Sequence, residues 1–157
     1  MKKEVTEPTE GQKAPDFKLS SSDGKIVSLG DFLGKQVVLY FYPKDMTPGC
    51  TAEACSFRDN ISKIEGKNAI VLGVSLDGED SHRQFLEKYG LPFLLLSDEK
   101  GEVSKRYGVY KQKNLYGKKF WGIERSTFII DQKGVIKKVF RKVKVDGHTK
   151  EVLAALS

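Results

Sequence analysis

Residues 36–59 read QVVLYFYPKDMTPGCTAEACSFRD. The first seven are dominated by β-branched and aromatic side chains, which is typical of a strand buried on both faces of a sheet. From Cys50 onward the apolar positions recur at helical spacing on one face. These positions are Cys50, Ala54, Phe57, Ile61 and Ile64. The stretch predicts a central strand, a loop and a helix, and it holds both cysteines of the chain, Cys50 and Cys55.

Strands and helices are predicted to alternate along the rest of the chain. Residues 16–29 are expected to form a β-hairpin, and residues 125–143 a second hairpin that turns at 131–134. A further buried strand is expected at 68–75 and a short strand at 91–97. Helices are expected from Cys50 to Gly66, from a capping box at Ser81 to Gly90, near 103–108 and after Asp146. The pattern predicts an α/β fold with a central mixed sheet flanked by helices.

The composition is that of a globular protein rather than a disordered one. The chain has 157 residues, 39% of them hydrophobic and 31% charged, which suits one domain over residues 1–157 with a loose arm at 1–14. No apolar run is long enough to cross a bilayer, and MKKEVTEPTE lacks an apolar secretory core. A cytoplasmic protein is therefore expected. The net charge of +6 comes from scattered lysines, which favours a solvated basic face over a nucleic-acid site.

Cys50 stands where the predicted helix begins. The free N–H groups and partial positive charge of a helix N-terminus stabilise an anion, so a thiolate is favoured there, and the thiolate is the nucleophilic form. The alternative is a small buried apolar residue, because Cys50 also lies on the apolar face. Pro43 and Pro48 stiffen the preceding loop. The Thr47 hydroxyl is placed either to contact a small oxygenated substrate or to cap the helix.

Cys55 lies five residues further along the same predicted helix. On an ideal helix the two Cα atoms would be about 8.6 Å apart and the side chains would point some 140° from each other. A disulfide requires Cα atoms within about 7 Å. We therefore expect Cys55 to attack an oxidised Cys50 only after the start of the helix unwinds. The alternative is that Cys55 has no part in the chemistry.

Three other features of the sequence bear on function. A zinc site would need four ligands, but His82 and His148 are not placed like a ligand pair and are expected at the surface or at helix caps. Residues 109–124 show no clean period and are predicted to be a long loop. Their aromatic side chains suit either a wall of the active site or a small satellite core. They are Tyr110, Tyr116, Phe120 and Trp121.

The segment from Pro43 to Cys50 resembles the P-x-x-x-T-x-x-C active-site signature of the peroxiredoxins. Cys55, five residues on, is similar to the pattern of the bacterioferritin comigratory protein or peroxiredoxin Q subfamily. Further similarity lies in GQKAPDFKL (11–19), GIERSTFIID (122–131) and KVKVDGHTKEVL (142–153). The resemblance covers nearly the whole chain. It implies a thioredoxin-like fold with an N-terminal β-hairpin, and a thiol peroxidase activity.

The resemblance also implies a role for each site residue. Cys50 would be the peroxidatic cysteine and Cys55 the resolving cysteine, joined during the cycle by an intramolecular disulfide. Thr47 would hydrogen-bond the peroxide, and Pro43 would shield the pocket. Arg125 would lie beside the sulfur, where an always-charged guanidinium stabilises the thiolate and the departing oxygen.

The implied partners are small peroxides and a thiol reductant. Hydrogen peroxide and alkyl hydroperoxides would be the substrates, thioredoxin the reductant, and no metal or organic cofactor is expected. A monomer with no nucleic-acid or membrane partner is implied. Two other functions use the same cysteines. One is a peroxide-responsive redox sensor that signals through helix unwinding, and the other is a dithiol oxidoreductase acting on protein disulfides.

Overall fold

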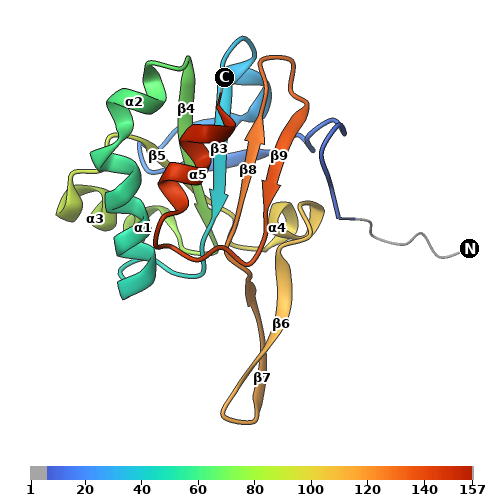
Figure 1. Ribbon diagram of the computed structural model, residues 1–157. Coiled ribbons are helices and arrows are strands. Elements are labelled where there is room, and N and C mark those ends of the chain that lie inside the picture. The colour runs from blue at the N-terminus through green and yellow to red at the C-terminus, as the bar shows by residue number, and fades with distance from the viewer. Residues whose placement is uncertain (1–6, 157) are drawn as a thin grey trace, which may run out of the picture.

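The computed structural model describes residues 7–156, and its centre is a mixed β-sheet (Figure 1). The strands of this sheet lie in the order β2-β1-β5-β4-β3-β8-β9. Their bounds are β1 Lys18–Ser21, β2 Ile26–Ser28, β3 Gln36–Phe41, β4 Ala69–Ser75, β5 Leu94–Ser97, β8 Ser126–Ile130 and β9 Ile136–Phe140. β3, β4 and β5 are parallel, and the outer strands pair antiparallel. The predicted mixed sheet and both of its hairpins are confirmed.

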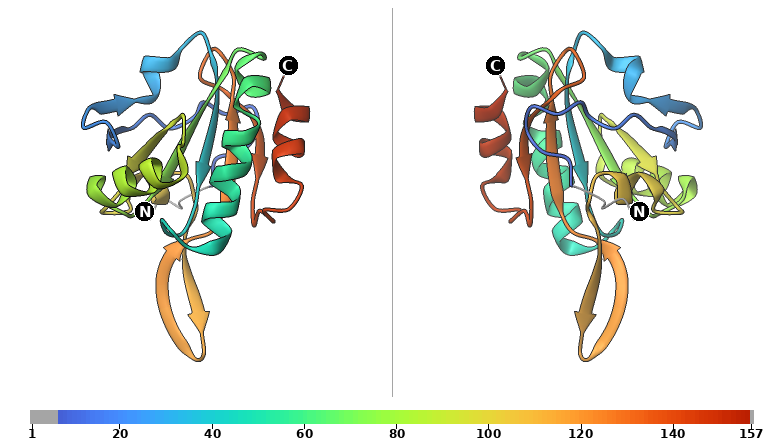
Figure 2. Two further views of the ribbon diagram at one scale, coloured as in Figure 1. Left: turned by 90° about the vertical axis from the view of Figure 1, so that its left-hand side faces the viewer. Right: turned by 90° about the vertical axis from the view of Figure 1, so that its right-hand side faces the viewer.

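Helices cover the sheet. Their bounds are η1 Leu29–Phe32, α1 Pro48–Asp59, α2 Ile61–Glu65, α3 Glu79–Tyr89, α4 Glu102–Arg106 and α5 His148–Ala155. Figure 2 shows α1 and α5 side by side on one side of the sheet. β3 is buried along its whole length, and its alternate side chains enter two different core clusters. A strand covered on both faces explains the unbroken apolar run from Val37 to Phe41.

The helix that follows Cys50 is interrupted. The sequence predicts one continuous helix to Gly66, but α1 ends at Asp59 and α2 begins at Ile61. Between them, Asn60 leaves the helical conformation with φ −115° and ψ 14°. Its side-chain amide donates to the carbonyl of Ser56 at 2.9 Å, a local bond that competes with the helical ladder. α1 is therefore a short helix of its own.

The predicted N-terminal arm is held to the body over part of its length. Gly11 donates to the carbonyl of Ile136, and Ala14 donates to the carbonyl of Gly134. Lys13 forms an isolated bridge with Val135, and the Ala14 side chain is buried. The expectation of a loose arm is thus wrong for residues 11–14, because their backbone pairs with the β8–β9 turn. Residues 1–6 lie outside the described range.

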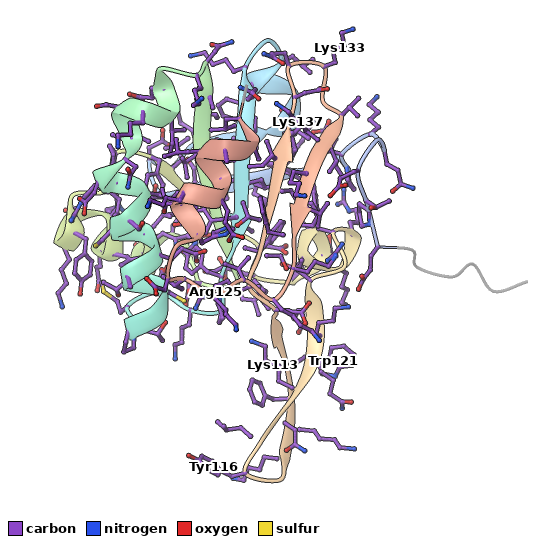
Figure 3. All side chains as sticks on the ribbon, viewed as in Figure 1. Lys113, Tyr116, Trp121, Arg125, Lys133 and Lys137 are labelled. Carbon is purple, nitrogen blue, oxygen red and sulfur yellow. The ribbon has the colours of Figure 1, made fainter. Side chains whose placement is uncertain are left out.

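Residues 109–124 do not form the predicted loop. β6 (Tyr110–Leu115) and β7 (Lys118–Ile123) make a two-stranded hairpin that projects from the body (Figures 1 and 2). Tyr116 and Gly117 at its tip both have positive φ, 52° and 79°, as type I′ turns require. Figure 3 shows Tyr116 at the far end and Arg125 at the base. Tyr116 is 97% exposed and Trp121 57% exposed, so these aromatic residues do not form a satellite core.

Within residues 7–156, no helix combines the length and the apolar character that crossing a lipid bilayer would need.

Candidate active site

The loop between β3 and α1 carries Pro43 and Thr47, two of the predicted site residues, and leads into Cys50 on α1. It leaves the carboxyl end of β3, an edge at which open α/β sheets commonly bind ligands. Thr47 takes the N-cap position and Pro48 the first helical position, where a missing N–H costs no hydrogen bond. Cys50 follows in the first turn of α1 and is only 1% exposed. The predicted start of the helix is confirmed, and its N-terminal dipole acts on the Cys50 sulfur.

Sheet pairing brings Arg125 to Cys50. Arg125 immediately precedes β8, and the antiparallel register pairs Ser126 with Phe41 at the end of β3. The side chain of Arg125 therefore reaches the loop that follows β3. Its Nη2 donates to the Sγ atom of Cys50 at 3.4 Å. The two residues are far apart in the chain, and the pairing of β3 with β8 is what places them together.

Glu53 holds the other side of the same guanidinium. Nη1 of Arg125 donates to Oε1 of Glu53 at 2.6 Å. Glu53 lies one turn after Cys50 on α1 and is 1% exposed. Among the described residues its second oxygen, Oε2, has no hydrogen-bond partner. The guanidinium is thus fixed between an acid and the sulfur, an arrangement that its planar fork of donors suits.

Burial sets the electrostatics of this trio. Desolvation raises the pKa of Glu53 to about 7, although the Arg125 cation pulls in the opposite direction. Burial disfavours the charge of Arg125 too, but Glu53 and Cys50 outweigh it and raise the pKa of Arg125 above its usual value. A permanent cation beside a buried sulfur stabilises the thiolate and any negative charge that forms on an attacking peroxide.

Thr47 and Pro43 lie in the loop, both half-buried. The hydroxyl of Thr47 donates to the carbonyl of Lys44 at 2.8 Å, within the loop itself. Thr47 occupies the N-cap position, but its side chain makes no capping hydrogen bond. Its hydroxyl oxygen therefore keeps acceptor capacity for a donor outside the loop.

Cys55 is not brought to Cys50. Both thiols are free, and both residues belong to the unbroken helix α1. Cys50 is buried, whereas Cys55 is half-buried. The sulfurs can join only if the backbone between them changes, because intact helical geometry holds the two Cα atoms too far apart.

The structure also shows site residues that the sequence reasoning missed. His82 and His148 were expected at the surface or at helix caps, but both are buried, at 0% and 1% exposure. The expected capping box at Ser81 is wrong as well, because α3 begins at Glu79 with Gly78 as its N-cap. The position of Glu53 could have been recognised from the sequence, because it stands three residues after Cys50 and so lies on the same side of the predicted helix. No pattern in the sequence singled out Asp45.

Asp45, Asp77 and His82 are the residues of the described chain best placed for a cation. One ligand atom from each lies within 4.8 Å of the other two. These atoms are already engaged with one another and with nearby hydroxyl groups. Asp77 accepts from Ser75, and Asp45 accepts from Tyr42. The cluster is therefore a hydrogen-bonded network in this structure.

Comparison with known proteins agrees with this geometry. The AhpC/TSA family model matches residues 10–139. A bcp relative from Coxiella burnetii is 55% identical over 146 residues, which cover 93% of this chain and 97% of the relative. The peroxiredoxin Bcp of Bacillus subtilis is 51% identical, with 93% of each chain covered. The structure of the Xanthomonas campestris bacterioferritin comigratory protein superposes with a TM-score of 0.87 at 40% identity, covering 98% of this chain and 97% of that one.

These matches confirm the thioredoxin-like fold and the resemblance read from the Pro43–Cys50 segment. They also place the chain among thiol-dependent peroxidases, whose substrates are peroxides and whose reductants are thiols. The chain belongs to the AhpC/TSA family, within the Bcp and peroxiredoxin Q group of peroxiredoxins.

Proposed function

We propose that Cys50 is the peroxidatic cysteine of this peroxidase and that Cys55 resolves it. The observation that carries the proposal is the Arg125 guanidinium, which donates to the Cys50 sulfur at 3.4 Å at the N-terminus of α1. Two independent sources of positive potential thus converge on one thiol. Cys55 has neither a helix N-terminus nor Arg125 beside it, which suits the second, resolving role.

The first step is attack of the Cys50 thiolate on one oxygen of a peroxide. The S–O bond forms as the O–O bond breaks, so Cys50 becomes a sulfenic acid and the departing oxygen leaves as water or an alcohol after gaining a proton. Arg125 stabilises the charge that builds on the two oxygens. Thr47 accepts a hydrogen bond from the peroxide O–H and orients it, while Pro43 closes one side of the pocket.

The second step forms the Cys50–Cys55 disulfide. The Cys55 thiol attacks the Cys50 sulfenic sulfur, and its proton and the hydroxyl leave together as water. Because both residues lie on α1, the turns between them must unwind first. A dithiol then reduces the disulfide by exchange, becoming a disulfide itself and restoring both thiols.

We propose the reductant, the substrates and the oligomeric state from the resemblance to the peroxiredoxins. Thioredoxin is the proposed reductant, and hydrogen peroxide and alkyl hydroperoxides are the proposed substrates. The alkyl peroxide reduction activity of the Xanthomonas campestris bacterioferritin comigratory protein supports the second substrate. A monomeric, single-domain enzyme is proposed because one chain supplies every residue of the site. A reducing compartment such as the cytoplasm would keep both thiols ready for each cycle.

Intact mass after one equivalent of hydrogen peroxide tests the proposal. The wild type should lose about 2 Da as the disulfide forms, and Cys55→Ser should gain about 16 Da, or about 32 Da on further oxidation. Cys50→Ser should keep its mass. An unchanged wild-type mass, or equal oxidation of Cys50→Ser, would overturn the assignment. Repeated turnover with excess peroxide and thioredoxin separates an enzyme from a sensor, which reacts once and does not need to turn over.

A further inference from the structure

A buried network fixes the active-site loop at Asp45. This residue lies midway between Pro43 and Thr47, and its side chain is 1% exposed. Its carboxylate accepts from the Tyr42 hydroxyl at 2.6 Å, from the Ser81 hydroxyl at 2.8 Å and from the His82 ring at 2.7 Å. Its backbone N–H donates to Asp77 at 2.8 Å. Contacts from the segments just after β3 and β4 and from the first turn of α3 thus converge on one residue of the loop.

The partners of His82 define its protonation. Nε2 lies 2.9 Å from the carbonyl of Leu96, and Nδ1 lies 2.7 Å from Oδ2 of Asp45. A carbonyl can only accept, so Nε2 must carry a hydrogen. A neutral imidazole has only one N–H, and Nδ1 would then be an acceptor facing a carboxylate. The short contact therefore requires one more proton, either on Nδ1 or on Asp45.

The other donors to Asp45 decide between these two positions. The hydroxyl groups of Tyr42 and Ser81 both donate to its carboxylate, one to each oxygen. Each carboxylate oxygen thus already accepts from a hydroxyl group, which favours the ionised form of Asp45. The extra proton then belongs on Nδ1. The remaining acid nearby, Asp77, accepts from the Ser75 hydroxyl and from the backbone of Asp45.

We propose that His82 is an imidazolium in the folded protein and that the His82–Asp45 ion pair is a positioning device for peroxide reduction. It acts through the loop and does not touch the substrate. A buried charge is tolerated when it is paired and fully hydrogen-bonded, and both conditions hold at His82. Removing the donor would leave the Asp45 carboxylate buried with one partner fewer, and the loop would move to hydrate it.

Backbone geometry shows why the loop needs such a device. Met46, between Asp45 and Thr47, has φ 67°, in the left-handed region that residues other than glycine rarely adopt. A strained residue persists only where its surroundings hold it in place. Asp45 anchors one side of Met46, and α1 begins just after its other side at Pro48. The pair therefore supports the conformation that presents Thr47 and the first turn of α1 to a peroxide.

Two substitutions separate the two hydrogen bonds of His82. His82→Asn places an amide N–H near the position of Nδ1 and keeps the bond to Asp45, whereas His82→Gln places one near Nε2 and keeps the bond to Leu96. The rate of Cys50 oxidation by hydrogen peroxide in a single turnover should fall about tenfold in His82→Gln, and His82→Asn should recover most of it. Equal rates in the wild type and both variants would overturn the positioning role.

A control is needed because any core change can weaken the fold. Ile136 lies in the core cluster that does not contain Tyr42, so Ile136→Val lowers stability without touching the Asp45 network. Its rate of Cys50 oxidation should stay at the wild-type value. The charge itself is tested on the unmodified protein. Nitrogen NMR of His82 should show two N–H groups and imidazolium shifts. A neutral ring with one N–H would overturn the ion pair, whatever the variants do.

Discussion

Arg125 donates a hydrogen bond across 3.4 Å to the sulfur of Cys50, a residue 75 positions earlier in the chain. The guanidinium is held in place beside the thiol, because its Nη1 donates to Glu53 at 2.6 Å. Glu53 on α1 therefore orients the Arg125 guanidinium toward Cys50 in the first turn of the same helix. The packing of β8 against α1 thus places the positive charge beside the sulfur. The contributions of Arg125 and Glu53 can each be tested.

Replacing Arg125 should slow the attack on peroxide more than it weakens the fold. Arg125→Met removes both the charge and the donor to Cys50, and the rate of Cys50 oxidation should fall about 100-fold, the usual cost of losing one transition-state donor. Arg125→Lys keeps the charge but loses the planar fork of donors, so its oxidation rate should lie between those of the wild type and Arg125→Met. Stopped-flow oxidation measures the rate. Arg83→Met, at an exposed position on α3, is the matched control, and an equal loss in that variant would contradict the role.

Gly49 should be sensitive to a single added methyl group. A Cβ atom there would lie 3.1 Å from Nη2 of Arg125, so the guanidinium would have to shift by a few tenths of an ångström. Gly49→Ala should therefore slow Cys50 oxidation several-fold, since small misplacements of a catalytic group are costly. At Gly30, a Cβ atom would have no described atom within 4 Å beyond its chain neighbours. Gly30→Ala should keep the wild-type rate, and if Gly49→Ala does as well, the position of Arg125 is not critical.

Stability should depend on pH through Glu53. Its pKa rises from 4.5 to about 7 on folding because the carboxyl is buried. The folded state thus binds more protons between these two values, and its stability falls as the pH rises through that window. At full effect the loss is about 3 kcal/mol. Urea unfolding at pH 4.5, 6 and 8 should show this slope in the wild type.

Glu53→Gln should flatten that slope, because an amide does not titrate. The comparison is between the two pH profiles, since loss of the Arg125 partner also shifts the absolute stability. Glu87→Gln on α3, whose side chain is in an exposed part of the helix, controls for the change of net charge. A Glu53→Gln profile parallel to the wild type would rule out Glu53 as the source of the pH dependence.

Oxidation should loosen α1. Amide hydrogens of residues 50–58 are expected to exchange faster in the disulfide form, because Cys50 and Cys55 cannot bond across an intact helix. Hydrogen-exchange mass spectrometry of the reduced and oxidised protein measures this. In Cys55→Ser, peroxide treatment should leave the exchange of the same segment close to the reduced level. Unchanged protection in a wild type that has formed the disulfide would show that unwinding is not required.

The local pattern of apolar residues was enough to predict the strand and the helix that build the core around Cys50. The apolar run at β3 and the helical spacing after Cys50 predicted a buried strand and a helix, and both are present. The β6–β7 hairpin was missed because its turn, Tyr116-Gly117, is not one of the usual hairpin pairs and its strands lack a buried face. The break at Asn60 was missed because no proline or glycine marks it in the sequence, and the bond from the Asn60 side chain to the Ser56 carbonyl appears only in the structure.

The sequence by itself determined that Cys50 would stand at a helix N-terminus, which Thr47 and Pro48 indicate, and that helical geometry would separate it from Cys55. From this position it predicts that Cys50 is the reactive thiol. Only the tertiary structure decided what surrounds that thiol. Arg125 reaches it through strand pairing, and Asp45 and His82 meet through the packing of α3 against the loop. Periodicity records which face of an element is buried, but it carries no information about which distant polar side chains will share that buried space. A histidine in the first turn of a polar helix therefore looked like a surface residue until the fold placed it in the core.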